Sequence, residues 1–127
     1  MKFQCKCGHL ICDQTDSLPY KCDILPDDGW WDNFHWPIVL AMVDFANSIA
    51  AGDREGWLSR YFGSDYPRNL DDKSVVSDLI AAYTTKLRQI YQCTECGSLF
   101  IRKTLGGEFV MFKPVDEDWR DILTWRG

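Results

Sequence analysis

The residues in this sequence with the clearest chemical potential are two pairs of closely spaced cysteines. Cys5 and Cys7 lie in the stretch FQCKCGHLI, and Cys93 and Cys96 lie in YQCTECGSLFI. Each stretch has an aromatic residue, a glutamine, two cysteines, a glycine and then an apolar run. Structural Zn²⁺ sites take four thiolates at about 2.3 Å, usually from two such pairs. The sequence therefore predicts that the four cysteines bind one zinc ion in a tetrahedral site.

The residues around each pair indicate how the sulfurs are positioned. Gly8 and Gly97 directly follow the second cysteine of their pairs, and glycine readily adopts the positive φ that a tight turn requires. Backbone N–H groups in such a turn can donate to the thiolates. The apolar flanks predict short strands on both sides of each turn. This pattern is typical of a zinc ribbon, and the sequence resembles that family at both turns, which we call knuckles.

Two features depart from an ordinary zinc ribbon. One residue separates Cys5 from Cys7, one fewer than usual, and 85 residues separate Cys7 from Cys93. The long separation predicts a helical insertion between the two halves of a small antiparallel sheet. The alternative interpretation of the cysteines is that they are reduced side chains buried as small hydrophobic groups.

Two cysteines and both histidines remain outside the predicted site. Cys22 shares the apolar face of a predicted strand with Tyr20 and Ile24, and we expect it in the core. Cys12 and His9 lie near the first knuckle and are the spare candidates for metal ligands. We expect packing for Cys12 and structural, hydrogen-bonded roles for His9 and His35.

No constellation in the sequence predicts catalysis. A catalytic zinc needs three protein ligands, an open position and a nearby base, whereas four cysteines leave no position open. No His-Glu-x-x-His helix, phosphate-binding glycine loop or nucleophile elbow is present. We therefore expect no enzyme, and a metal-dependent enzyme is the third of the functional hypotheses.

Length and composition predict a single domain of 127 residues. A hydrophobic fraction of 46% is sufficient for a core, and no apolar run is long enough to cross a membrane. The N-terminus carries no hydrophobic signal segment, so we expect a cytoplasmic protein with no membrane contact. The cysteine spacing in such a protein favours metal binding over disulfides.

Negative charge is concentrated in one segment beside tryptophans. Residues 13–32 contain six Asp and one Lys, so the net charge of this segment is −5. The formal net charge of the whole chain is also −5. Tryptophan supplies an anchor for protein binding, and carboxylates steer a basic partner toward it. We predict a partner-binding surface at Asp27, Asp28, Trp30, Trp31 and Asp32. The alternative is that the tryptophans are in the core and the aspartates form a solvated rim.

Nucleic-acid binding is the second hypothesis. The acidic balance, with a pI near 4.9, argues against it because phosphates would be repelled. It requires a basic face in the folded protein that contains Arg88, Arg102, Lys103 and Lys113, and binding that weakens with salt.

Periodicity predicts three helices between the knuckles and strands around them. After a break at 26–29, we expect helices over 37–51, 54–62 and 73–88, the second beginning after Asp53 and the third after Asp71 or Asp72. Residues 18–25, 99–103 and 108–113 are predicted strands, and 116–123 a short helix before the tail. The predicted inward faces comprise Ile38, Ala41, Met42, Phe45 and Ile49, then Trp57, Leu58 and Tyr61, then Val76, Leu79, Ile80, Tyr83 and Leu87.

These elements define an α+β fold. Residues 1–25 and 88–115 form the zinc-ribbon-like sheet, 26–87 the helical insertion, and 116–127 a short helix and tail. The opening CKCG, followed by DQTDSLPYK and ILPD, resembles small bacterial proteins with a split zinc ribbon. The resemblance implies a cytoplasmic bacterial protein with ligands at Cys5, Cys7, Cys93 and Cys96 and no catalytic residue. Small acidic proteins of this class are often immunity proteins that neutralise basic toxins, so by analogy a toxin is the expected partner.

Overall fold

Six short strands and a run of helices give the chain an α+β fold in a computed structural model that describes residues 1–127. The chain divides into two compact units, and most contacts of each unit are internal to it. We call residues Met1–Leu25 and Leu87–Gly127 the sheet unit, and residues Pro26–Lys86 the helical unit. None of the helices combines the length and the apolar content that a bilayer crossing requires.

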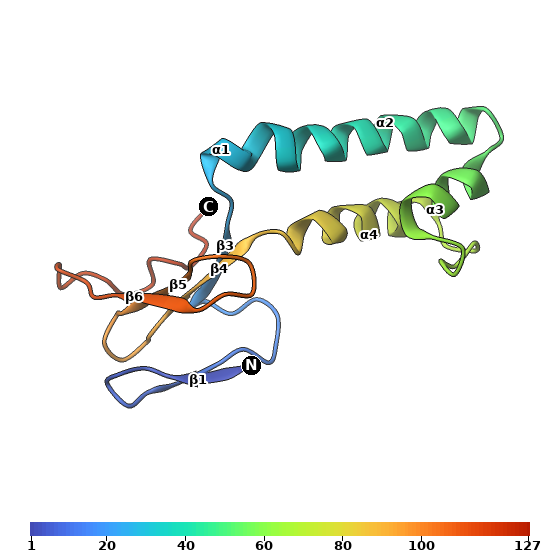
Figure 1. Ribbon diagram of the computed structural model, residues 1–127. Coiled ribbons are helices and arrows are strands. Elements are labelled where there is room, and N and C mark those ends of the chain that lie inside the picture. Colours follow the sequence, from blue (N-terminus) through green and yellow to red (C-terminus); the bar gives the residue numbers. More distant parts are fainter. The chain divides into compact units, whose positions relative to one another are not determined.

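The sheet unit contains a two-stranded hairpin and a four-stranded antiparallel sheet (Figure 1). The hairpin carries the first knuckle in the turn between its two strands. The second knuckle lies between β4 and β5. The hairpin strands are β1 (Lys2–Gln4) and β2 (Leu10–Cys12), and the sheet, in the order β3-β4-β5-β6, comprises β3 (Lys21–Ile24), β4 (Arg88–Gln92), β5 (Leu99–Arg102) and β6 (Phe109–Phe112).

An aromatic core joins the hairpin to the sheet. Phe3 of β1 lies 5.4 Å from the Tyr91 ring centroid, 5.1 Å from that of Phe100 and 4.8 Å from that of Phe109. Ile11 of β2 is buried in the same cluster. Alternation along the strands explains the packing, because Tyr91 and Phe100 are paired in register and so lie on one face of the sheet. This core fixes the two knuckles relative to each other.

The helical unit is a helical hairpin in which α4 runs back along α2 (Figure 1). Asp71 caps α4, since its Oδ1 accepts from the Ser74 N–H at 2.8 Å. Asp53 precedes α3, but its side chain makes no capping bond. The elements are α1 (Asp27–Gly29), the π-helix η1 (Trp30–His35), α2 (Trp36–Ala50), α3 (Arg54–Phe62) and α4 (Asp72–Thr84).

The core of the helical unit partly matches the predicted faces. Six residues form the buried cluster: Ala41, Phe45, Trp57, Leu58, Val75 and Leu79. Val75, which was not among the predicted positions, is completely buried, whereas the predicted Val76 is partly buried and packs against this cluster. Four residues predicted to point inward are exposed instead: Met42, Ile49, Tyr61 and Ile80.

Other predicted elements also differ from the structure, and the three largest differences have local causes. Residues 27–29 are helical rather than a break, because Pro26 precedes the first turn, where its missing N–H costs nothing. The last helix ends at Thr84, since Arg88 already pairs with Ile24 in the sheet. Residues 116–123 form turns and no helix, and Asp121 has a φ of 58° that an α-helix excludes.

Candidate metal centre

The first knuckle is the turn that connects β1 and β2. The Cys5 N–H donates to the His9 carbonyl at 2.8 Å, and the Gly8 N–H donates to the Cys5 carbonyl at 2.9 Å. Gly8 has a φ of 96°, as the sequence predicts for this turn. The side chain of Gln4 donates to the Gly8 carbonyl at 3.1 Å. These bonds close a short loop that holds Cys5 and Cys7.

The second knuckle repeats this geometry between β4 and β5. The Cys93 N–H donates to the Ser98 carbonyl at 2.8 Å, and the Gly97 N–H donates to the Cys93 carbonyl at 2.8 Å. Gly97 has a φ of 74°. Gln92, the counterpart of Gln4 in the sequence repeat, donates its side-chain N–H to the Trp119 carbonyl at 2.6 Å. The second glutamine therefore attaches the C-terminal segment to the knuckle.

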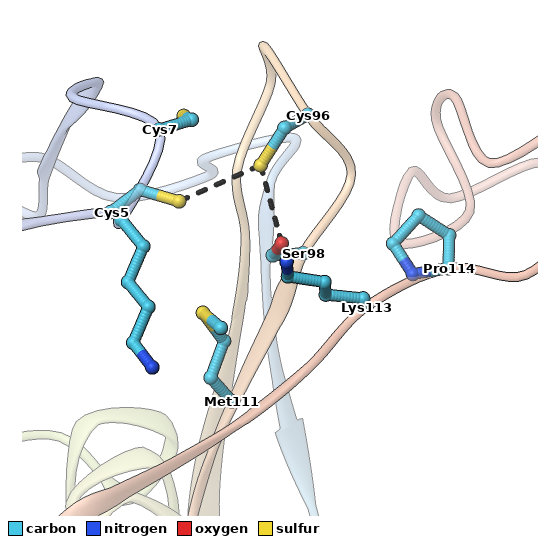
Figure 2. Close-up of a pocket in the computed structure, with 8 residues that line it drawn as sticks. Cys5, Cys7, Cys96, Ser98, Met111, Lys113 and Pro114 are labelled. Carbon is cyan, nitrogen blue, oxygen red and sulfur yellow. Dashed lines mark hydrogen bonds between the residues drawn. The ribbon is translucent and has the colours of Figure 1, made fainter.

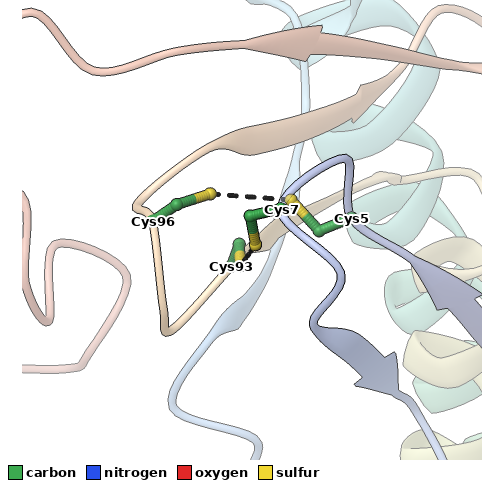
Figure 3. Close-up of side chains that lie close together, drawn as sticks. All are labelled: Cys5, Cys7, Cys93 and Cys96. Carbon is green, nitrogen blue, oxygen red and sulfur yellow. Dashed lines mark hydrogen bonds between the residues drawn. The ribbon is translucent and has the colours of Figure 1, made fainter.

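The four predicted cysteines come together, although they lie near opposite ends of the chain. The Sγ atoms of Cys5 and Cys96 are 3.5 Å apart (Figure 2). Those of Cys7 and Cys93 are 3.6 Å apart, and all four lie within 4.8 Å of one another (Figure 3). Four thiolates at 2.3 Å from one ion would be about 3.8 Å apart in a regular tetrahedron. The sulfur positions therefore fit a single four-coordinate metal ion.

Burial and hydrogen bonds set the protonation of these sulfurs. Burial raises the pKa of the Cys5 thiol and raises that of Cys93 to about 12. Burial acts in the same direction on Cys96, but hydrogen bonds from Ser98 and the neighbouring sulfurs outweigh it and lower its pKa to about 6. Cys96 therefore loses its proton more readily than Cys5 or Cys93, and a metal ion that binds the centre must displace the protons that remain on the cluster. Metal affinity should consequently rise with pH.

Two polar residues beside the sulfurs were not identified from the sequence. The Ser98 hydroxyl lies 3.2 Å from the Cys96 sulfur, and the Thr94 hydroxyl lies 3.2 Å from His9 Nε2 of the other knuckle. The position of Ser98 directly after Gly97 is the only sequence signal for its role. His9 thus links the two knuckles and lies outside the sulfur cluster, in line with the structural role expected for it.

A cavity of about 310 Å³ opens beside Cys5, Cys7 and Cys96. Figure 2 shows Lys113 and Met111 on its other side, and Lys6 also lines it. A divalent ion with four thiolates carries a net charge of −2, so lysine side chains here would offset part of that charge. Cys12 and Cys22 are not part of the sulfur cluster.

The predicted partner-binding residues form α1 and the start of η1 in the helical unit. Trp30 and Trp31 are exposed by 40% and 54%, and their ring centroids lie 6.4 Å apart. Asp27, Asp28 and Asp32 are exposed beside them. The interpretation of these tryptophans as core residues was therefore wrong. His35 packs between Trp31 and Trp36, with both ring centroids at 5.0 Å.

Together, the fold and the site define a small α+β protein with a four-cysteine centre that could hold a metal ion. The chain belongs to the family described as a domain of unknown function, DUF8617, whose model matches residues 1–118. The matched region includes both knuckles and the whole helical unit. No curated protein and no solved structure matches the chain.

Proposed function

We propose that the four-cysteine centre holds one structural zinc ion and that the sheet unit is a split zinc ribbon. The observation that carries this proposal is the convergence of four sulfurs within 4.8 Å. Zinc accepts four thiolates in a tetrahedral arrangement and needs no further ligand there. Since the site offers no open position for water or substrate, we assign it a role in folding and none in catalysis.

The residues around the centre would orient the sulfurs. Backbone N–H groups of Glu95 and Cys96 face the Cys93 sulfur, and both the backbone N–H and the hydroxyl of Ser98 face the Cys96 sulfur. Such donors stabilise thiolates and fix their direction, as partners of metal ligands generally do.

Metal analysis of the purified protein tests the proposal directly. We expect one zinc per chain by elemental analysis and the corresponding mass by native mass spectrometry. A visible absorption band from iron–thiolate bonds would contradict zinc while retaining the site. A protein that binds no metal, with all four thiols free to react, would contradict the site itself.

Substitution of one ligand should strongly destabilise the sheet unit. We expect Cys96→Ser to lose stoichiometric zinc and to lower the free energy of unfolding by about 3 kcal/mol or more, because structural zinc contributes folding free energy. Cys22→Ser is the matched control, since Cys22 lies in β3 outside the sulfur cluster. Equal melting temperatures for Cys96→Ser and the unmodified protein would contradict a structural metal.

We further propose that the protein is a non-enzymatic binding module whose helical unit recognises a basic protein. A basic toxin is the partner class that we favour. The exposure of Trp30 and Trp31 beside Asp27, Asp28 and Asp32 supports this, because the aromatic rings provide area and the carboxylates provide attraction. The net charge of −5 acts in the same direction.

Nucleic-acid binding receives less support from the basic residues named for it. The Arg88 guanidinium donates to the Lys103 carbonyl at 2.8 Å. The Arg102 guanidinium donates to Gln89 and to the Gly107 carbonyl, and lies 4.4 Å from the Phe109 ring centroid. Both groups are occupied within the sheet unit, so fewer cations remain for phosphates.

Calorimetry with the product of the neighbouring gene would test the binding role. We expect a complex that the triple substitution Asp27→Asn, Asp28→Asn and Asp32→Asn weakens at least tenfold. Asp116→Asn, Glu117→Gln and Asp118→Asn together form a control with the same change of charge at another exposed segment. Tight, salt-sensitive binding of RNA or DNA without a protein complex would instead support the nucleic-acid hypothesis.

A further inference from the structure

One side of α2 is apolar, exposed and without charge. Trp36, Leu40 and Val43 follow one another at the i, i+4, i+7 spacing of a helix face, and their exposed fractions are 48%, 64% and 52%. Asp44 is the only charged residue among the 15 of α2. Its carboxylate forms an ion pair with Arg60, with 3.8 Å between Asp44 Oδ2 and Arg60 Nη2. An exposed apolar stripe of this kind commonly marks an interaction surface.

The π-helix extends this stripe by one further tryptophan. The Trp36 N–H donates to the Trp31 carbonyl, an i to i+5 bond that places Trp31 above Trp36. Their ring centroids lie 6.3 Å apart, and Trp31 is 54% exposed. In a regular α-helix the two side chains would point in directions roughly 140° apart. We call Trp31, Trp36, Leu40 and Val43 the α2 stripe.

We propose that the α2 stripe pairs with the α2 stripe of a second copy of this chain, with the two helices antiparallel. The large side chains of the stripe lie toward the N-terminal end of α2. Beyond Val43, at the i+3, i+4 and i+7 positions, the exposed residues are Ala46, Asn47 and Ala50. A two-fold axis near Val43 places the large half of each helix on the small half of the other. Such self-complementarity is what a symmetric dimer requires.

Charge distribution favours this occupant over a basic partner. The stripe carries no charge, so its best partner is another uncharged face, and a second α2 is one. The antiparallel direction also keeps the Asp27, Asp28 and Asp32 clusters of the two copies at opposite ends, whereas a parallel pair would bring them together. The inference does not depend on the metal, and because it buries Trp31 in the dimer, the second copy and the basic partner proposed above would compete for that side chain.

The available area sets the expected strength of the dimer. The four side chains of the stripe expose roughly 400 Å² in each chain, and with the small residues two copies would bury on the order of 1,000 Å². This is near the lower limit for a specific interface. We therefore expect a dissociation constant in the micromolar range and a mass that depends on concentration.

Analytical ultracentrifugation of the full metal-loaded chain tests the dimer. The expected mass rises from 14.7 kDa toward twice that value as concentration increases through the micromolar range. We expect Leu40→Lys to weaken association at least tenfold. Leu105→Lys is the matched control and should not change it, because Leu105 is 61% exposed on the β5–β6 turn of the sheet unit. Circular dichroism checks that both variants remain folded.

A mixing experiment tests the position of the two-fold axis. Val43→Lys and Val43→Glu should each be monomeric alone, because the axis brings each substituted residue against its own copy. An equimolar mixture should restore a dimer that contains one chain of each kind. A monomer at every concentration, a dimer insensitive to Leu40→Lys, or a mixture that stays monomeric would each overturn the antiparallel pairing.

Discussion

Asp13 connects three segments of the sheet unit through one carboxylate. It accepts from Lys21 Nζ at 2.8 Å and from the hydroxyl of Tyr91, a fully buried residue of β4. Burial opposes the charged carboxylate, but the hydrogen bonds from Lys21 and Tyr91 outweigh it and hold the pKa of Asp13 below its ordinary value of 3.8. Burial and Asp13 together raise the pKa of Tyr91. The ion pair should therefore stabilise the unit that carries the cysteines.

Asp13→Asn should lower the free energy of unfolding at neutral pH by about 1–2 kcal/mol, because it removes a charge-assisted hydrogen-bond acceptor. The folded pKa lies below the unfolded one, so this contribution is complete above the unfolded pKa and is lost as pH falls through the folded pKa. In urea denaturation, the difference in free energy of unfolding between the unmodified protein and Asp13→Asn should be constant above about pH 5. It should approach zero in acid. A difference that grows in acid would contradict a stabilising role of the ionised Asp13 carboxylate.

The residues that could be predicted from the sequence are those with a local signature. The cysteines and the glycines after them carry their geometry in adjacent positions, and the structure brings the sulfurs together. Thr94 and Asp13 act through partners that the fold brings from distant parts of the chain, namely His9 and Tyr91. A single sequence contains no local sign of such contacts.

At the scale of elements, the two knuckle turns differ in what surrounds their glycines. A side chain at Gly8 would meet nothing within 4 Å, whereas a Cβ at Gly97 would lie 2.3 Å from the Trp119 ring. Both glycines have positive φ. We expect Gly8→Ala to cost about 1–2 kcal/mol of stability from backbone strain alone, and Gly97→Ala to cost at least about 1 kcal/mol more from overlap.

Thermal denaturation of the two variants measures this difference. A double variant that combines Gly97→Ala with Trp119→Ala should show less loss than the sum of the two single changes, since the overlap is then absent. Strict additivity would indicate that the C-terminal segment does not press on the second knuckle.

The core position in α4 gives a second prediction at this scale. Val75 is completely buried, whereas Val76 is partly exposed. We expect Val75→Ala to lower the free energy of unfolding by about 2 kcal/mol, and Val76→Ala by less than about 1 kcal/mol. Urea denaturation followed by helical circular dichroism provides the measurement. The reverse order would mean that α4 packs through the face predicted from the sequence.

The differences between predicted and observed elements have physical causes. Apolar spacing in α4 fits two adjacent faces, and packing against α2 and α3, which the spacing does not reveal, buries Val75 more deeply than Val76. The π-turn at Trp30–His35 has no local sequence signal, because its extra residue becomes favourable only through the aromatic packing around it. In residues 116–123, acidic residues suit a helix start, but the bond from Gln92 to the Trp119 carbonyl and the bond from Thr124, the next residue, to the Pro19 carbonyl hold the segment in turns.

At the scale of the whole molecule, the two units should respond differently to loss of metal. The helical unit has its own buried core around Trp57 and Val75, whereas the core of the sheet unit includes Cys5 and Cys93 themselves. We expect a chelator to unfold the sheet unit and to leave most helical circular dichroism intact. Hydrogen exchange should show protection lost in β4 and β5 and retained in α2 and α4.

A single transition, in which helical and strand signals disappear together as metal is removed, would contradict this independence. Re-addition of zinc should restore protection in the strands.

The α+β class and the joining of the chain's two ends could be predicted at this scale, because each knuckle alone supplies only two of four ligands. The compactness of the inserted segment depends on long-range packing that periodicity alone does not reveal.

The pairing of β3 with β4 has a consequence for how such proteins can change. Ile24 lies opposite Arg88 in this ladder, so the polypeptide leaves one strand and re-enters the next at neighbouring positions. A two-residue turn of the kind found in ordinary hairpins would join the same strands. We therefore expect the register that positions the second knuckle to survive when residues 26–86 are excised or exchanged for another module. A change of the inserted module would then leave the sulfur centre in place.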